Sequence, residues 1–118
     1  ITINSFFSVS IDHSILAISL SNNSNTKSYI NNNKRFSLSI LSYGQEDYAN
    51  FFSKKKKELI PNNFEFLKND MGLNYIKNSS AIFFCKPKSE QIVGDHTVVF
   101  CKIDDVDFTD RPPLIWKF

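Results

Sequence analysis

Two apolar, strand-like segments flank a tight turn in the second half of the chain. Ala81–Lys86 and Thr97–Val106 are rich in Val, Ile and Phe, which favour strands. The Gly94-Asp95 dipeptide between them is typical of a turn. Strands that follow one another through short turns pair antiparallel. We therefore expect a mainly β fold, an antiparallel sheet closed as a barrel with short helices at its side.

Further strands are indicated by apolar segments elsewhere in the chain. Phe36–Leu41 alternates strictly between apolar and polar residues, which is the period of a strand. We place Pro87 at the end of its strand, because proline lacks the N–H that pairs with a neighbouring strand. The remaining predicted strands are Ile1–Ser10, Ile15–Leu20 and Leu73–Ile76.

Two short helices are predicted between these strands. Ser24 can cap a helix that runs through Asn32. The second helix spans Gln45–Ser53, with Ser42 as its cap, and carries three aromatic side chains on one side. That aromatic face belongs to the core or to a dimer interface. Lys54–Lys57 after it is either a solvated loop or a patch that steers anionic ligands.

Length and composition limit the class of protein. The 118 residues are expected to form one domain, 1–118. A net charge of +2 is too small to indicate a nucleic-acid partner, and no apolar run is long enough to cross a membrane. The start has neither a signal-peptide layout nor an initiator Met, so we expect the chain to begin inside a longer protein. Cys85 and Cys101 are expected to be buried free thiols in a reducing compartment, the cytoplasm.

Several segments, in this order along the chain, resemble the motifs of the flavin reductase-like family. Thr2–Ser10 is similar to the family strand that lines the flavin. Ser24-Asn25-Thr26 resembles its S-x-T motif, and Lys34–Leu41 resembles the strand that follows it. Gly94–Phe100 resembles its G-D-H-T turn and strand, and the tail Pro113–Trp116 resembles its closing segment. The family fold is an FMN-binding split β-barrel, of which this chain is expected to lack the N-terminal strand or strands.

Two departures from the family pattern bear on flavin binding. Ile11–Ile15 stands where the family has a turn with two prolines, and Ser39 stands where it has an Asn. The loss of two prolines frees the turn and restores N–H donors. We expect the fold to tolerate both changes.

The resemblance implies a bound FMN or FAD and a set of flavin-binding side chains. Hydroxyl groups are suitable donors to a flavin phosphate. Without the resemblance, Ser24 is only a helix cap, and the first segment is an ordinary half-buried strand. The residues that the family pattern assigns to the flavin are Thr2, Asn4, Ser5, Phe6, Ser8, Ser24 and Thr26.

The resemblance also implies a nicotinamide-positioning group at Gly94, Asp95 and His96. His96 can donate a hydrogen bond to an amide or a phosphate of the nucleotide. Hydride transfer requires no general base, so this role is positioning, and we assign no catalytic acid or base and no metal. The alternative is a turn histidine paired only with Asp95. His13 has no comparable support and is interpreted as a surface residue.

The implied function is an oxidoreductase that transfers a hydride from NADH or NADPH to FMN or FAD. The resemblance also implies a homodimer and, as a further partner, a monooxygenase that uses the reduced flavin. The alternative is a non-enzymatic FMN carrier or sensor of the same fold. A third interpretation is a barrel that has lost flavin and serves as an interaction module.

Overall fold

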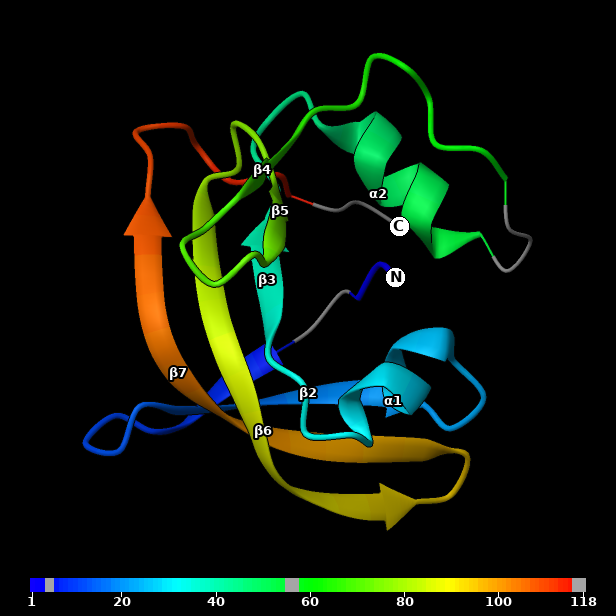
Figure 1. Cartoon of the computed structure of the whole chain (residues 1–118), viewed down its shortest axis with the longest axis vertical. Helices are drawn as coiled ribbons and strands as arrows, with labels where there is room; N and C mark the ends of the chain where they lie inside the picture. The colour runs from blue at the N-terminus through cyan, green and yellow to red at the C-terminus, as the bar shows by residue number, and fades with distance from the viewer. Residues whose placement is uncertain (4–5, 55–57, 116–118) are drawn as a thin grey trace.

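The computed structural model describes residues 1–3, 6–54 and 58–115. Asn4, Ser5, Lys55–Lys57 and Trp116, all of which entered the predictions above, lie outside the described residues. Figure 1 shows a curved sheet with two short helices on one side. The elements are β1 (Phe6–Ser10), β2 (Ile15–Ser21), α1 (Asn25–Ile30), β3 (Phe36–Ile40), α2 (Glu46–Ser53), β4 (Phe66–Lys68), β5 (Asn74–Ile76), β6 (Ala81–Val93) and β7 (His96–Phe108).

The main sheet has five strands in the order β1-β2-β7-β6-β3, and every neighbouring pair is antiparallel. This confirms the predicted mainly β, antiparallel class with two short helices. β1 and β3 form the two edges and are not paired with each other, so the sheet is not closed by a hydrogen-bonded ladder among the described residues. β4 and β5 form a separate hairpin, of which the sequence patterns had indicated only β5.

The long strands β6 and β7 bend and divide the sheet into two parts (Figure 1). β3 pairs with β6 only as far as Cys85, whereas β2 pairs with the other end of the β6–β7 hairpin. The register between β6 and β7 shifts after Phe84 and again after Pro87, and such bulges bend a strand. These shifts allow the β6–β7 hairpin to pair with β3 in one part of the sheet and with β2 in the other.

Pro87 lies inside β6, so its predicted place at the end of the strand is wrong. The physical reason is that β3 begins at Phe36, opposite Cys85, and pairs with β6 only from there back to Ala81. Beyond that point β6 is paired with β7 alone among the described residues, and a proline on the open side removes no ladder hydrogen bond. The strand can therefore continue through Pro87 to Val93.

The core lies against the inner face of the sheet and under α1. Cross-strand partners share a face, and three successive pairs from β2 and β7 are buried there. Ile30 at the end of α1 is 2% exposed and covers this cluster. The buried members of this core cluster are Leu16, Ile18, Leu20, Ile30, Cys85, Val99 and Cys101.

Cys85 and Cys101 are free and buried, as predicted for their state in the fold. Burial raises the pKa of each thiol to about 12, because a thiolate would lose its hydration there. Both thiols therefore stay protonated near neutral pH and behave as small apolar core groups.

The helix α2 begins after Gln45, and Ser42 does not cap it, which corrects the prediction. The Ser42 hydroxyl instead donates to the carbonyl of Asn78 at 2.7 Å. Gln45 accepts from the Ser42 N–H and donates to the carbonyl of Lys77, so both side chains join α2 to the segment after β5. The distant carbonyls of residues 77 and 78 could not be read from the local pattern.

The aromatic side of α2 packs against the segment that leads into β4. Tyr48 stacks on Phe64 with ring centroids 4.0 Å apart, and Phe51 meets the same ring edge-on at 5.5 Å. Phe52, also on α2, lies near the rings of Phe64 and Phe66, so the aromatic face of α2 forms a local cluster with these two residues.

Within the described ranges, no helix is long and apolar enough to cross a membrane.

Candidate flavin and nicotinamide site

The pairing of β2 with β7 brings together two segments that are far apart in the sequence. His96 lies directly opposite Ser21, the last residue of β2. The chain then turns through Asn22 and Asn23, and this turn is closed by a hydrogen bond from the Ser24 N–H to the Ser21 carbonyl at 3.1 Å. The turn that carries His96 therefore lies beside the loop that leads to Ser24 and α1, at the right of Figure 1.

Asn22 joins this loop to the β6–β7 turn through three hydrogen bonds. Its backbone N–H donates to the Asp95 carbonyl at 3.0 Å, and its side-chain NH₂ donates to the Gly94 carbonyl at 3.2 Å. Its side-chain oxygen accepts from the hydroxyl of Thr97, a residue that is 1% exposed. Sequence reasoning missed this residue, because all three partners are more than 70 positions away.

Gly94 gives the β6–β7 turn its shape. Its φ is +61°, and it is the first of two residues between the paired Val93 and His96. A two-residue hairpin turn of type II′ requires a positive φ at that position, which glycine adopts without steric cost. The turn predicted from the Gly-Asp dipeptide is confirmed.

His96 is half exposed, and its Nδ1 lies 2.9 Å from the Asp95 carboxylate. The hydrogen bond with His96, followed by the charge of the imidazole, lowers the pKa of the Asp95 carboxyl. A histidine held through Nδ1 keeps its other ring nitrogen, Nε2, for a ligand. The pairing with Asp95 is thus present, and it is compatible with a positioning role, which remains a prediction.

Ser24 is the N-cap of α1, as its sequence position indicated. Its hydroxyl oxygen accepts from the Lys27 N–H at 3.0 Å. A serine that accepts through its oxygen still has its hydroxyl hydrogen to donate, so capping and phosphate binding are compatible. Thr26, two residues further on, is half buried in the first turn. Because α1 has only six residues, few peptide dipoles align there, and the two hydroxyls are the main donors that it offers.

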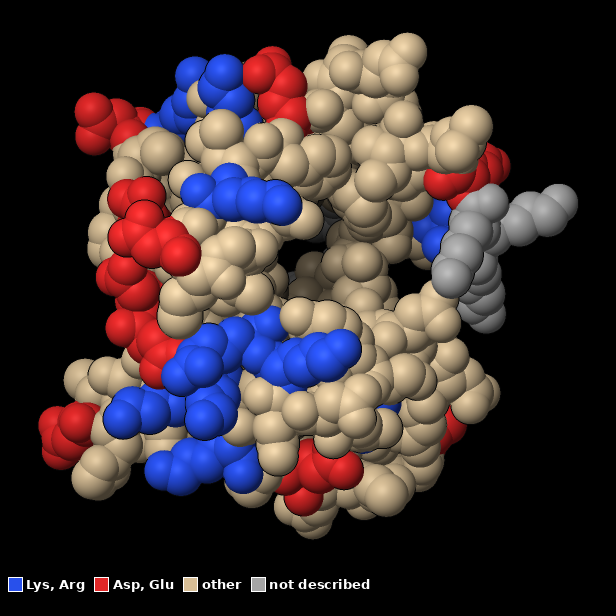
Figure 2. All heavy atoms as spheres, viewed as in Figure 1, with Lys and Arg blue, Asp and Glu red and all other residues tan. Residues whose placement is uncertain are grey.

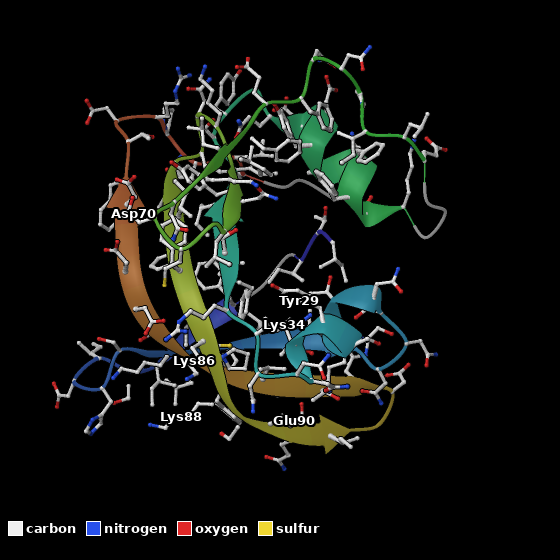
Figure 3. The ribbon with its side chains drawn as sticks, in the orientation of Figure 1. Tyr29, Lys34, Asp70, Lys86, Lys88 and Glu90 are labelled. Carbon is white, nitrogen blue, oxygen red and sulfur yellow. The ribbon has the colours of Figure 1, made fainter. Side chains whose placement is uncertain are left out.

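Lys27 follows directly and is buried, with 6% of its surface exposed. Its ammonium group lies 2.9 Å from the Glu90 carboxylate on β6 and also contacts the side-chain oxygen of Asn31. Figure 3 shows Glu90 between β6 and α1. This ion pair fixes α1 on the sheet, and its partners are too far apart in sequence for a local pattern to indicate it.

The two described candidates on β1 lie at different distances from this loop. Phe6 lies opposite Ile18 and Ser8 opposite Leu16, so both share the face that carries the core. Phe6 is the nearer to Ser21, at three residues or about 10 Å along β2, and Ser8 is about 17 Å away. The structure therefore places Phe6, and not Ser8, near the loop that precedes Ser24.

Thr2 precedes β1 and is engaged elsewhere. Its hydroxyl donates to the Ala49 carbonyl at 2.7 Å, and its N–H donates to the Phe52 carbonyl at 3.1 Å. Both bonds fasten the start of the chain to α2. The hydroxyl hydrogen of Thr2 is therefore not available to a flavin in this structure.

Basic side chains gather beside α1. Figure 2 shows Lys and Arg over the middle of β6 and the segment before β3, with Asp and Glu in a column along β7. Lys34 lies over the ring of Tyr29, 4.9 Å from its centroid, and Arg35 pairs with Asp104 at 3.0 Å. Lys34, Lys86 and Lys88 are exposed and lie on the same side of the molecule (Figure 3). Such a surface attracts phosphate-bearing ligands.

These donors fit the phosphate of a flavin in part. Ser24 and Thr26 offer hydroxyls at the start of α1, and His96 offers a ring nitrogen from the adjacent turn, whereas the hydroxyl of Thr2 already donates to the Ala49 carbonyl. The fold is thus an antiparallel sheet whose central hairpin carries His96 at one end, beside the loop that leads to Ser24. The chain belongs to the flavin reductase like domain family, whose model matches residues 1–118.

Individual relatives agree with this family. The chain is 28% identical over 102 residues to the NADH-dependent flavin reductase StyB of Pseudomonas fluorescens, covering 86% of this chain and 58% of that protein. It is 26% identical over 116 residues to the FMN reductase (NADH) SmoA of Agrobacterium fabrum, covering 98% and 66%. The chain thus spans about three fifths of the length of these relatives.

A solved structure supports the same fold. The flavin reductase of the styrene monooxygenase from Pseudomonas putida S12 superposes with a TM-score of 0.82 at 27% sequence identity. The match covers 94% of this chain and 70% of that one.

Proposed function

We propose that this chain is the flavin- and nicotinamide-binding domain of an NADH-dependent flavin reductase. The observation that carries the proposal is the juxtaposition of Gly94-Asp95-His96 with the Ser24–Thr26 segment through the pairing of Ser21 with His96. NADH is chosen over NADPH because both curated relatives named above are NADH-dependent. FMN and FAD both remain candidate acceptors.

The redox chemistry is supplied by the flavin as hydride acceptor and the nicotinamide as hydride donor. The chain's residues bind and orient them. Ser24 and Thr26 donate hydroxyl hydrogen bonds to the flavin phosphate, and Phe6 offers an apolar edge at the start of β1. Asn4, Ser5 and Ser8 are kept as flavin-binding candidates on the family pattern alone.

His96 positions the nicotinamide nucleotide through Nε2, while Asp95 holds its other nitrogen. A fixed ring orientation raises the fraction of encounters in which donor and acceptor are aligned. No step in this scheme requires the imidazole to take up a proton from the substrate. The carrier alternative differs in one respect, because a carrier would bind flavin without oxidising NADH.

The experiment that tests the proposal follows NADH oxidation by the intact protein, with and without added FMN. We expect oxidation that requires both FMN and protein, with a rate that rises in proportion to the protein and saturates with FMN and with NADH. FMN bound without NADH oxidation would favour the carrier, and the absence of FMN binding would favour the degenerate interaction module.

We also propose that a second copy of the chain covers the outer side of β1. Phe7 is 59% exposed and Val9 is 47% exposed, and both lie on β1, which is an edge strand of the sheet formed by the described residues. Exposed apolar side chains on an edge strand favour association. Light scattering on the intact protein with flavin is expected to give twice the monomer mass, and a stable monomer would contradict it.

A monooxygenase that consumes the reduced flavin is the proposed downstream partner. It is supported by the styrene monooxygenase reductase of the same fold. We place the protein in the cytoplasm, because its two buried thiols are unpaired.

A further inference from the structure

We propose that Asn22 is a positioning residue that holds the His96 turn in register with the flavin-binding loop. The inference rests on the proposed function and adds a residue to it. Asn22 is outside the family motifs described above. It is nevertheless the residue that joins the two candidate binding segments, since it bonds to Gly94, Asp95 and Thr97 from the loop that leads to Ser24.

The three bonds of Asn22 act on different parts of the turn. The bonds to the carbonyls of Gly94 and Asp95 fix the two residues between the paired strands. The bond from Thr97 anchors the same side chain to a buried position of β7, so the Asn22 amide cannot rotate freely. His96 lies between Asp95 and Thr97, and both of its neighbours are therefore tied to Asn22.

The amide is required for this arrangement because it offers a donor and an acceptor at once. The NH₂ group faces a carbonyl, and the oxygen faces a hydroxyl hydrogen. A carboxylate of the same shape would accept from Thr97 but could not donate to Gly94, and its second oxygen would repel the Gly94 carbonyl. Asn22→Asp thus breaks one bond with almost no change in volume.

The test compares Asn22→Asp with Asn23→Asp in the intact protein. Asn23 is the exposed neighbour in the same loop, so its substitution adds the same charge at nearly the same place. We expect Asn22→Asp to raise the KM for NADH about three- to tenfold, the effect of one lost hydrogen bond, and to leave the dissociation constant of FMN within about twofold. Asn23→Asp is expected to change neither.

Thr97→Val provides an independent variant. Valine has nearly the shape of threonine, and it removes the donor that anchors Asn22 without adding a charge. We expect it to raise the KM for NADH, as Asn22→Asp does. Because the two variants are independent, the inference can still be tested if one of them folds poorly.

The decisive arm places Asn22→Asp in a His96→Ala background. If Asn22 acts through His96, the double variant should have the KM of His96→Ala alone, because coupled residues are not additive. Full additivity, or an equal loss of FMN affinity and NADH affinity, would overturn the positioning role. A wild-type protein that binds FMN and oxidises NADH, with Asn22→Asp indistinguishable from Asn23→Asp, would overturn this inference alone. A wild-type protein that does neither would overturn the proposed function as well.

Discussion

Glu90→Gln is expected to lower the free energy of unfolding by about 2–3 kcal/mol. Glu90 is the charged partner of Lys27, whose side chain is 8% exposed. Removing one partner of a buried ion pair leaves an uncompensated charge out of water, which costs about 3–5 kcal/mol in a fully buried site. The side chain of Glu90 is 43% exposed, and water can therefore replace part of the lost interaction.

Replacing the other partner of the pair, Lys27, is expected to lower the free energy of unfolding much less. Lys27→Met removes the buried charge and keeps an unbranched apolar side chain, while Glu90 can be hydrated at the surface. We expect a change within about 1 kcal/mol, and the double variant should recover most of the stability lost in Glu90→Gln. Urea unfolding with linear extrapolation measures all three variants. A Glu90→Gln variant as stable as Lys27→Met would contradict the burial of the Lys27 charge.

Ser24→Gly combined with Thr26→Val is expected to weaken FMN binding about 30-fold or more. Each substitution removes a hydroxyl donor to a charged phosphate, and together they should cost at least about 2 kcal/mol. Glycine is chosen at Ser24 because it is tolerated as an N-cap at a cost of a few tenths of a kcal/mol. Valine at Thr26 keeps the shape of the side chain. Quenching of flavin fluorescence gives the dissociation constant of FMN for the wild type and for the double variant.

Riboflavin is the control ligand, because it has the same ring system without the phosphate. The double variant should bind riboflavin within about threefold of the wild-type affinity, since no phosphate contact is lost. Equal losses for FMN and riboflavin would mean that Ser24 and Thr26 support the loop rather than the phosphate.

The elements that were predicted correctly depend on local chemistry. The strand before Ser21 and the cap at Ser24 are encoded within a few residues of sequence. The turn at Gly94 is confirmed for the same reason, since only a positive φ closes a two-residue hairpin of this type. Patterns that act over a short stretch of chain can therefore be recognised without the fold.

The features that were missed depend on the fold as a whole. Pro87 is tolerated within β6 because the pairing of β6 with β3 stops at Cys85, opposite Phe36, which the sequence around the proline does not reveal. Ser42 was a suitable cap for α2 by spacing, but the carbonyl of Asn78 competes for its hydroxyl.

The candidate site divides in the same way. The residue types at Ser24, Thr26 and His96 could be selected from motifs. Their proximity depends on the register of β2 against β7, and the contacts of Asn22 depend on the same register.

The central claim is that this chain holds a flavin so that NADH can reduce it. The most direct test is the absorbance spectrum of the intact protein mixed with one equivalent of FMN without oxygen, before and after one equivalent of NADH. We predict that the flavin absorbance near 450 nm is lost together with the NADH absorbance near 340 nm, faster than in a protein-free mixture, since binding aligns donor and acceptor. A flavin spectrum that is unchanged after NADH, or that bleaches no faster than without protein, would contradict the account.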